Sequence, residues 1–247
     1  MSNAFPSLPP PGTVSIVIPV YNERQLILQV VDLVESVRLP AGLRRELVIV
    51  DDKSKDGTTE VLRDLAARRP DLKILFHQIN CGKGGALATG FAAATGDVIL
   101  IQDADLEYNP HQYPELLAPL IEGRAEVVYG SRYADPNRRK SPWWHTLGNR
   151  VLTGLSNLLS GQRVTDMECC YKVFRRQVLQ QVVIQENRFG FEPEITAKVA
   201  RLKVRLIEVP VDYVSRSYNE GKKIGWKDGV SAIRCILRYG IGPHAKP

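Results

Sequence analysis

The stretch VILIQDADLEYNP, residues 98–110, runs from four apolar side chains directly into a cluster of acids. A short apolar run of this kind predicts a strand that is buried on both faces, as the strands of a parallel sheet are. Asp103, Asp105 and Glu107 follow just past its end. In open α/β sheets, ligands bind beyond the carboxyl ends of the strands. The stretch therefore predicts a buried strand that ends at a negatively charged ligand site.

Similar apolar runs recur along the chain, and segments with apolar residues at helical spacing lie between them. We expect strands at 14–20, 46–52, 72–77, 97–103 and 125–132, and helices at 22–37, 56–69, 82–95 and 109–123. This alternation predicts right-handed βαβ units. The expected fold is α/β, with a Rossmann-like, mostly parallel central sheet flanked by helices.

The length of 247 residues and an apolar content of 44% suit one packed domain. We expect a loose Pro-rich lead-in at residues 1–12, a catalytic domain at 13–240 and a tail at 241–247. No apolar run approaches the ~18–20 residues that a membrane-spanning helix needs, and the N-terminus lacks the pattern of a signal peptide. None of the four cysteines has metal-site or CxxC spacing, so a reducing cytoplasm is the simplest expectation.

Asp103 and Asp105 are candidate metal ligands. Two carboxylates one residue apart in an extended loop can reach the same hard cation. Mg²⁺ or Mn²⁺ takes one or two protein carboxylates and fills its other positions with phosphate oxygens and water. The alternative is that both acids only cap the next helix or form Asx turns. We favour the metal site, because other acids are expected at the same edge of the sheet.

Two further motifs at strand ends leave two interpretations open. In the run at residues 51–54, either Asp52 or Ser54 begins the next helix, or a carboxylate such as that of Asp51 accepts hydrogen bonds from a nucleobase or ribose. Lys83, in the run Gly82–Gly85, either contacts phosphate at a helix N-terminus or belongs to a small-residue helix that packs closely on the sheet. The run matches neither the P-loop nor the Rossmann glycine pattern.

The chain resembles the family 2 glycosyltransferases, which have the A-type glycosyltransferase fold, over about residues 13–240. The motifs that carry the resemblance are IPVYNE (18–23), VDDKSKDGT (50–58), NCGKGGAL (80–87), DADLEYNP (103–110) and GSRY (130–133). Three later motifs resemble the dolichol-phosphate mannose synthase branch, which loads a hexose onto a polyprenyl phosphate. They are TDMECCYKVF (165–174), FGFEPEI (189–195) and IEVPVDYVSRSYNEGKKIGWKDG (207–229).

The resemblance implies a role for each residue that matches a motif. The base and ribose of the nucleotide would be held by Pro19, Tyr21, Glu23 and Asp51. Asp103 and Asp105 would bind Mg²⁺ or Mn²⁺ together with the donor diphosphate, and Glu107 could join the metal shell.

The acceptor side is implied by later residues. Ser131 and Arg132 would meet the acceptor phosphate, with Asp166 nearby, although a helix-capping role for Asp166 is equally open. Arg216 and Lys222 would lie in a loop that closes on the phosphates and would stabilise the leaving diphosphate.

We therefore expect a metal-dependent, inverting transfer of a hexose from a nucleotide sugar to a polyprenyl or dolichyl phosphate. GDP-mannose is the favoured donor, and UDP-glucose is the other candidate. Residues 105–110 and 169–172 depart from the usual family pattern, which leaves the sugar open. The alternative function is a family 2 enzyme that acts on a sugar hydroxyl or on a protein. A nucleic-acid-binding module, suggested by the net charge of +6, is disfavoured because the basic residues are scattered.

A lipid acceptor would require contact with a membrane surface or a membrane-protein partner. Residues 145–160 and 226–240 each predict a helix with an apolar stripe, and the second helix also has a basic side. Such helices can lie in a membrane interface. The alternative is that both stripes pack on the sheet. The expected location is the cytoplasm, at the cytoplasmic face of a membrane.

Overall fold

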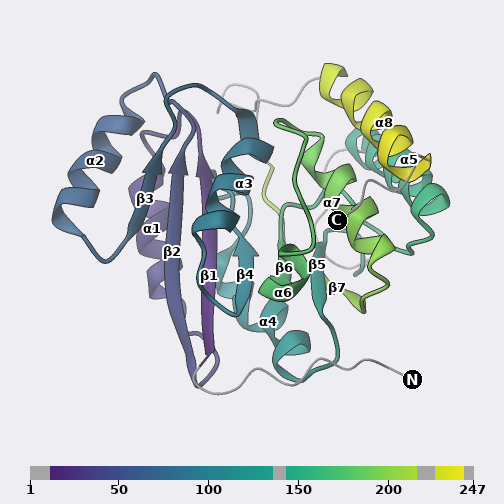
Figure 1. Ribbon diagram of the computed structural model, residues 1–247, viewed down its shortest axis with the longest axis horizontal. Helices are drawn as coiled ribbons and strands as arrows, with labels where there is room; N and C mark the ends of the chain where they lie inside the picture. The colour runs from purple at the N-terminus through teal and green to yellow at the C-terminus, as the bar shows by residue number, and fades with distance from the viewer. Residues whose placement is uncertain (1–11, 136–142, 216–225, 242–247) are drawn as a thin grey trace.

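The computed structural model describes residues 12–135, 143–215 and 226–241, and these form a seven-stranded sheet with helices on both faces (Figure 1). The strand order is β3-β2-β1-β4-β6-β5-β7. The strands are β1 (Gly12–Val20), β2 (Leu43–Asp51), β3 (Lys73–Phe76), β4 (Val98–Ile101), β5 (Val127–Ser131), β6 (Lys172–Arg175) and β7 (Leu206–Pro210). The helices are α1 (Ile27–Ser36), α2 (Thr58–Arg68), α3 (Gly82–Ala93), the 3₁₀ turn η1 (Pro110–Gln112), α4 (Tyr113–Ile121), α5 (Trp143–Ser160), α6 (Arg176–Leu179), α7 (Phe191–Arg201) and α8 (Trp226–Ile241).

The predicted α/β fold with a mostly parallel sheet is confirmed. Strand β4, the apolar run at residues 98–101, is buried at all four positions and lies between β1 and β6. On the other side of β1, strand β2 ends in five consecutive buried residues. Full burial of each Val, Ile or Leu side chain stabilises the fold by about 1.5–3 kcal/mol, so these strands form the centre of the core.

Strand β6 is the main departure from the expected pattern. It pairs antiparallel with both β4 and β5, and neither β6 nor β7 was predicted from the apolar runs. Because β6 runs against its neighbours, it begins at the edge where β4 and β5 end. The segment before it, residues 165–171, is thereby delivered to the same edge.

The first predicted helix begins later than expected, at Ile27 instead of residue 22. Residues 22–26 are held as a loop against the β2–α2 connection. Asn22 has a positive φ of 54°, its N–H donates to Ser54 Oγ at 2.9 Å, and its side chain accepts the N–H of Lys55 at 2.8 Å. The N–H of Glu23 donates to Thr58 Oγ1 at 3.0 Å. These bonds fix the backbone in a form that a helix would not allow.

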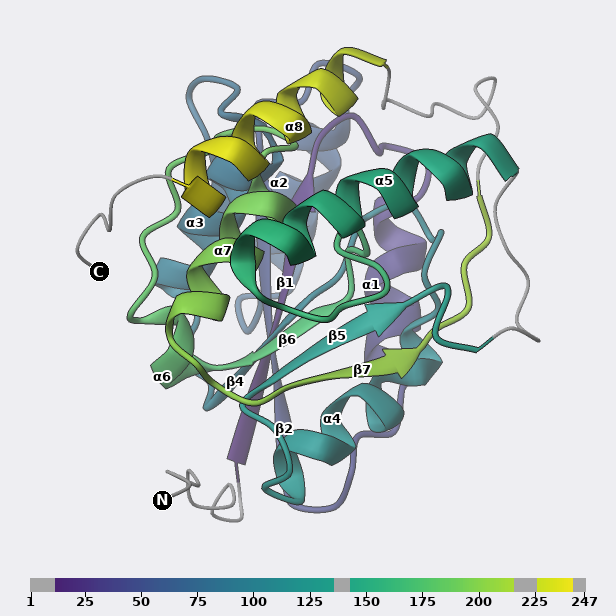
Figure 2. The same cartoon turned by 90° about the vertical axis from the view of Figure 1, so that its right-hand side faces the viewer.

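Helices α5, α7 and α8 form an outer layer beside β5 and β7 (Figure 2), where α5 and α8 run side by side over α7. Among the described ranges, no helix has both the length and the apolar character needed to cross a bilayer. The expected lead-in and tail lie outside the described residues, apart from Gly12 and Ile241.

Candidate active site

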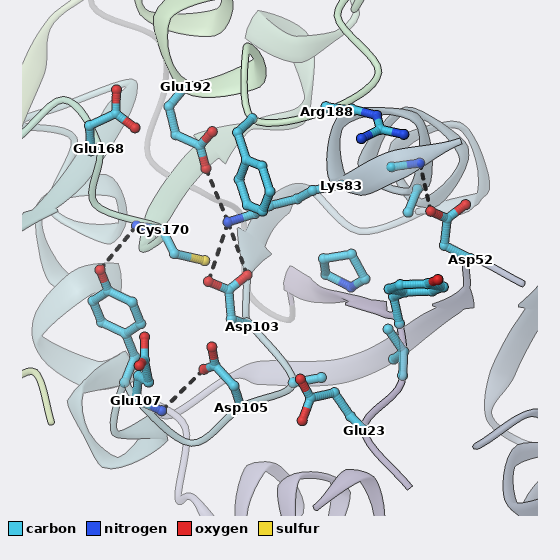
Figure 3. Close-up of a pocket in the computed structure, with 18 of the residues that line it drawn as sticks. Glu23, Asp52, Lys83, Asp103, Asp105, Glu107, Glu168, Cys170, Arg188 and Glu192 are labelled. Atoms are coloured by element: carbon cyan, nitrogen blue, oxygen red, sulfur yellow. Dashed lines mark hydrogen bonds and ion pairs between the residues drawn. The ribbon is translucent and has the colours of Figure 1, made fainter. Parts of the chain in front are cut away.

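A pocket of about 370 Å³ opens at the edge where the parallel strands end. Its walls include residues that follow β1, β2 and β4 and residues that precede β6 and α7 (Figure 3). Among the described residues, seven acids line it against three basic side chains. The acids are Glu23, Asp52, Asp103, Asp105, Glu107, Glu168 and Glu192, and the bases are Lys83, Arg132 and Arg188. The pocket therefore carries an excess of negative charge and favours a cation.

The predicted metal ligands lie in this pocket. Both oxygens of Asp103 face the Lys83 ammonium, at 3.1 and 3.3 Å. Asp105 Oδ1 accepts the N–H of Glu107 at 3.1 Å, which is an Asx turn, and Glu107 accepts the hydroxyl of Tyr213 at 2.8 Å. Neither aspartate caps the following helix, because Asn109 accepts the N–H of His111 there.

The donor set at the end of β4 fits a hard cation. Its donors are carboxylate oxygens, and Mg²⁺ or Mn²⁺ needs only one or two of them when a diphosphate supplies further oxygens. Within the described residues, the group of three candidate ligands that converges within 4.8 Å is a different one, Asp52, His77 and Cys81.

Hydrogen bonds already engage the atoms of that second group. The Asp52 carboxylate accepts the N–H groups of Cys81 and Gly82 at 2.7 and 2.6 Å. His77 contacts Asp52 through Nδ1 at 2.7 Å and Thr89 through Nε2 at 2.9 Å. We interpret this group as the support for the start of α3.

Lys83, near the N-terminus of α3, forms ion pairs with two acids of the pocket. Its ammonium bridges Asp103 and Glu192, at 3.1 and 3.0 Å. Burial lowers the pKa of Lys83, but the nearby carboxylates, led by Asp103, outweigh burial and raise it well above its usual value. The ammonium therefore stays protonated and offsets part of the acidic charge.

The glycines beside Lys83 are required for packing. Gly82 has φ +77°, and a Cβ at Gly84 would stand 1.9 Å from the backbone oxygen of Glu186. Gly90, further along α3, lies against Val17 of β1. The close-packing interpretation thus holds for the helix, with the loop at residues 186–187 and the sheet as its two contacts.

The predicted nucleotide-binding residues divide into two groups. Pro19, Tyr21 and Glu23 line the pocket. The carboxylate of Asp51 accepts the hydroxyl of Thr59 at 2.6 Å, and Asp51 is not among the pocket walls that the structure describes; its neighbour Asp52 is. A contact between Asp51 and the nucleotide stays a prediction.

Arg132 lines the pocket, and its side chain is held by the buried carboxylate of Asp166. Its Nε and Nη2 donate to the two oxygens of Asp166, both at 2.7 Å, and its backbone N–H also donates to Asp166 at 3.0 Å. Asn149 of α5 adds a bond to Asp166 at 3.0 Å, and Ser131 pairs with Thr165 at 2.6 Å. Asp166 and Ser131 are both fully buried, and Asp166 fixes the orientation of the Arg132 guanidinium.

Sequence reasoning missed several walls of the pocket. Glu168, Cys170, Arg188 and Glu192 line it, although none of them was predicted as a site residue. Burial and the charge of Asp103 raise the pKa of the Cys170 thiol well above its ordinary value, so it stays neutral. The local signal that could have found Glu192 is an acid in the first turn of α7. Arg216 and Lys222 lie outside the described residues.

Comparison with known proteins agrees with this geometry. The model of the family "Glycosyl transferase family 2" matches residues 15–183. An undecaprenyl-phosphate mannosyltransferase from Micrococcus luteus is 31% identical over 91% of this chain and 93% of its own length. An undecaprenyl-phosphate 4-deoxy-4-formamido-L-arabinose transferase from Edwardsiella ictaluri is 31% identical over 85% of this chain, which spans 62% of that protein.

Solved structures agree on the fold. Glucosyl-3-phosphoglycerate synthase from Mycobacterium tuberculosis, in complex with Mn²⁺, UDP and phosphoglyceric acid, superposes with a TM-score of 0.70 at 21% identity, covering 95% of this chain and 80% of its own. The same enzyme in complex with Mg²⁺ and UDP superposes with a TM-score of 0.68 at 21% identity, covering 95% of this chain and 81% of its own. At this identity the likeness confirms the A-type glycosyltransferase fold alone.

Proposed function

The chain belongs to glycosyl transferase family 2, and from this premise we propose that it transfers a hexose from a nucleotide sugar to a polyprenyl phosphate. The proposal is supported by the names of its relatives, which act on undecaprenyl phosphate. GDP-mannose is the favoured donor because a relative that matches nearly end to end is named as a mannosyltransferase. UDP-glucose stays the second candidate.

The observation that carries the proposal is the charge of the pocket. Seven acids face three basic side chains, so a diphosphate would be repelled unless a cation entered with it. Asp103 and Asp105 would hold Mg²⁺ or Mn²⁺, with Glu107 beside them. The bound ion would offset the charge of the leaving diphosphate. Pro19, Tyr21 and Glu23 would hold the base and ribose, and Lys83 would lie next to the diphosphate.

Arg132 is the proposed contact for the acceptor phosphate. Its guanidinium is oriented by Asp166, and planar guanidinium groups suit phosphate oxygens. The acceptor oxygen is already anionic at neutral pH, so no strong general base is required. Arg216 and Lys222 would add positive charge at the leaving group, and this part of the proposal rests on the motif alone.

A membrane-facing surface is proposed on α5 and α8. In α5, Asn149, Thr153 and Ser156 are buried, whereas Leu147 and Leu158 are 56% and 78% exposed. A surface helix normally buries its apolar stripe, whereas α5 packs only Leu152, Leu155 and Leu159 partly against the core and leaves its other described apolar side chains exposed.

The neighbouring helix extends this apolar surface. Helix α8 exposes Val230, Ile233 and Leu237. Across the described chain, seven of the eleven exposed large apolar side chains lie on these two helices. Exposed Arg150 and Arg234 add positive charge. An apolar surface with basic residues suits an anionic lipid surface, where each basic residue contributes ~1 kcal/mol.

A binding screen followed by a transfer assay tests the proposal. GDP, UDP and their sugars are added with Mg²⁺, Mn²⁺ or EDTA, and the melting temperature is recorded. A ligand at a hundredfold excess over Kd raises the free energy of unfolding by about 2.7 kcal/mol. For a chain of this size, the melting temperature then rises by about 5–11 °C. The best donor is then offered with a short polyprenyl phosphate or with a sugar hydroxyl.

Transfer to the polyprenyl phosphate is the expected result. Transfer to the hydroxyl acceptor alone would favour the alternative family 2 activity. Absence of any metal-dependent nucleotide binding would contradict the proposal as a whole.

A further inference from the structure

Two acids lie on the side of the pocket away from Asp52 and Glu23, as Figure 3 shows for Glu168 and Glu192. Glu192 belongs to the first turn of α7 and is only 3% exposed. Glu168 precedes β6. Within the described residues, Glu192 Oε2 and Glu168 Oε1 are buried and accept no hydrogen bond.

Buried acceptors without a donor are costly. Leaving one unsatisfied costs about 1–3 kcal/mol, and more for a charged group. Native proteins rarely tolerate this outside functional sites, so each such atom needs an explanation. Burial, together with the negative charge of Glu192, raises the pKa of Glu168 well above its ordinary value. Both observations indicate that this end of the pocket lacks hydrogen-bond donors.

The position of these acids matches the order of groups in a nucleotide sugar. Lys83 joins Asp103 to Glu192 at 3.1 and 3.0 Å, so Glu192 adjoins the proposed metal and diphosphate region. Figure 3 shows Glu168 on one side of the pocket and Asp52 on the other, with Asp103 and Asp105 between them and Glu192 next to Asp103 across the Lys83 ammonium. A diphosphate at Asp103 with its base toward Asp52 would direct the sugar to these two acids.

The chemistry of the two oxygens selects the ligand group. The Glu192 carboxylate repels a phosphate, so the diphosphate and the acceptor phosphate are unfavourable here. Glu168, with its raised pKa, is largely protonated near neutral pH and can donate as well as accept a hydrogen bond. Glu192 Oε1 is already paired with Lys83, which leaves Oε2 for a neutral donor. Sugar hydroxyl groups each supply one O–H donor and fit these acceptors.

We propose that Glu168 and Glu192 form the subsite that binds hydroxyl groups of the transferred sugar and selects among donor sugars. This inference rests on the proposed function, because it assumes a nucleotide sugar in the pocket. A site built to accept a sugar O–H discriminates strongly against an analogue that lacks it, since its buried acceptor is then left unpaired.

The test compares a nucleoside diphosphate with its sugar conjugate. Affinities of GDP, UDP, GDP-mannose and UDP-glucose are measured with Mn²⁺ by calorimetry for the wild type and for Glu168→Leu and Glu192→Gln. The glutamine variant keeps the shape and one acceptor at a position where leucine could disturb the Lys83 pair. Glu168→Gln is the conservative partner of Glu168→Leu, and exposed Glu115→Gln on α4 is the matched control.

The expected result is a loss of at least tenfold in affinity for the nucleotide sugar with Glu168→Leu, while the diphosphate alone binds within twofold of wild type. Glu168→Gln should recover part of the loss. Deoxy analogues of the donor extend the test: removal of the contacted hydroxyl weakens binding to the wild type but has little further effect in Glu168→Leu.

Two results would overturn the subsite while leaving the proposed function intact. One is an equal loss for diphosphate and nucleotide sugar. The other is loss of the Mn²⁺ dependence of diphosphate binding, which would make the two acids a cation site. If the wild type binds neither diphosphate nor nucleotide sugar, the proposed function fails and the subsite fails with it.

Discussion

Replacing Asp166 with asparagine tests how the pocket arginine is held. Asp166 is fully buried and accepts three hydrogen bonds from Arg132 and one from Asn149. Asparagine keeps the shape, but it removes the negative charge and turns an N–H₂ group toward other donors. The Arg132 side chain, 13% exposed, is then left without its counter-charge.

The expected loss of stability follows from that geometry. Removing one partner of a buried ion pair costs about 3–5 kcal/mol. The Arg132 guanidinium also lies over the ring of Tyr213, 5.0 Å from its centroid, and borders the pocket, so partial hydration favours the lower value. We expect the free energy of unfolding, measured by urea denaturation, to fall by about 3 kcal/mol. This corresponds to a fall in melting temperature of about 6–12 °C.

A double-mutant cycle separates this mechanism from a general packing effect. Arg132→Met is measured alone and together with Asp166→Asn. If Asp166 acts through Arg132, the double variant is no less stable than Asp166→Asn alone. Asn149→Ala removes one neutral donor and should lower the free energy of unfolding by only about 1 kcal/mol. A loss below 1 kcal/mol in Asp166→Asn, or simple additivity in the cycle, would refute the reasoning.

The remaining predictions concern the metal, the membrane surface and pH. Asp105→Asn should abolish the metal-dependent rise in melting temperature with nucleotide sugar and leave the unliganded protein as stable as wild type; a retained Mn²⁺ effect would contradict the metal assignment. Leu158→Glu should weaken flotation with anionic vesicles at low salt, whereas Leu28→Glu on α1 should not, and equal flotation of both variants would exclude α5 as the contact. Burial would raise the pKa of Glu46, but hydrogen bonds, led by that from Lys73, lower it to about 2. Its stabilisation is therefore present above about pH 4.5 and is lost as the pH falls toward 2, so Glu46→Gln should cost about 1 kcal/mol at pH 7, after allowance for solvent screening, and nothing near pH 2. Denaturation curves at the two pH values measure this difference.

The sequence alone was sufficient for the fold class and for one part of the site. Runs such as residues 98–101 and the helical spacing between them are local patterns, and burial on both faces selects apolar residues at every position of a central strand. Asp103 and Asp105 could be found because they directly follow such a strand. Their position at the pocket depends only on the direction of β4.

Tertiary structure alone decided how the other side chains are used. Nothing local indicates that β6 runs antiparallel, yet its direction brings Asp166 and Glu168 to the edge where β4 ends. Lys83 meets Asp103 and Glu192 only after three distant segments have packed together. Strand pairing and ion pairs between remote segments are set by the whole core, so whether an acid supports the pocket, as Asp166 does, or lines it, as Glu168 does, cannot be read from its neighbours along the chain.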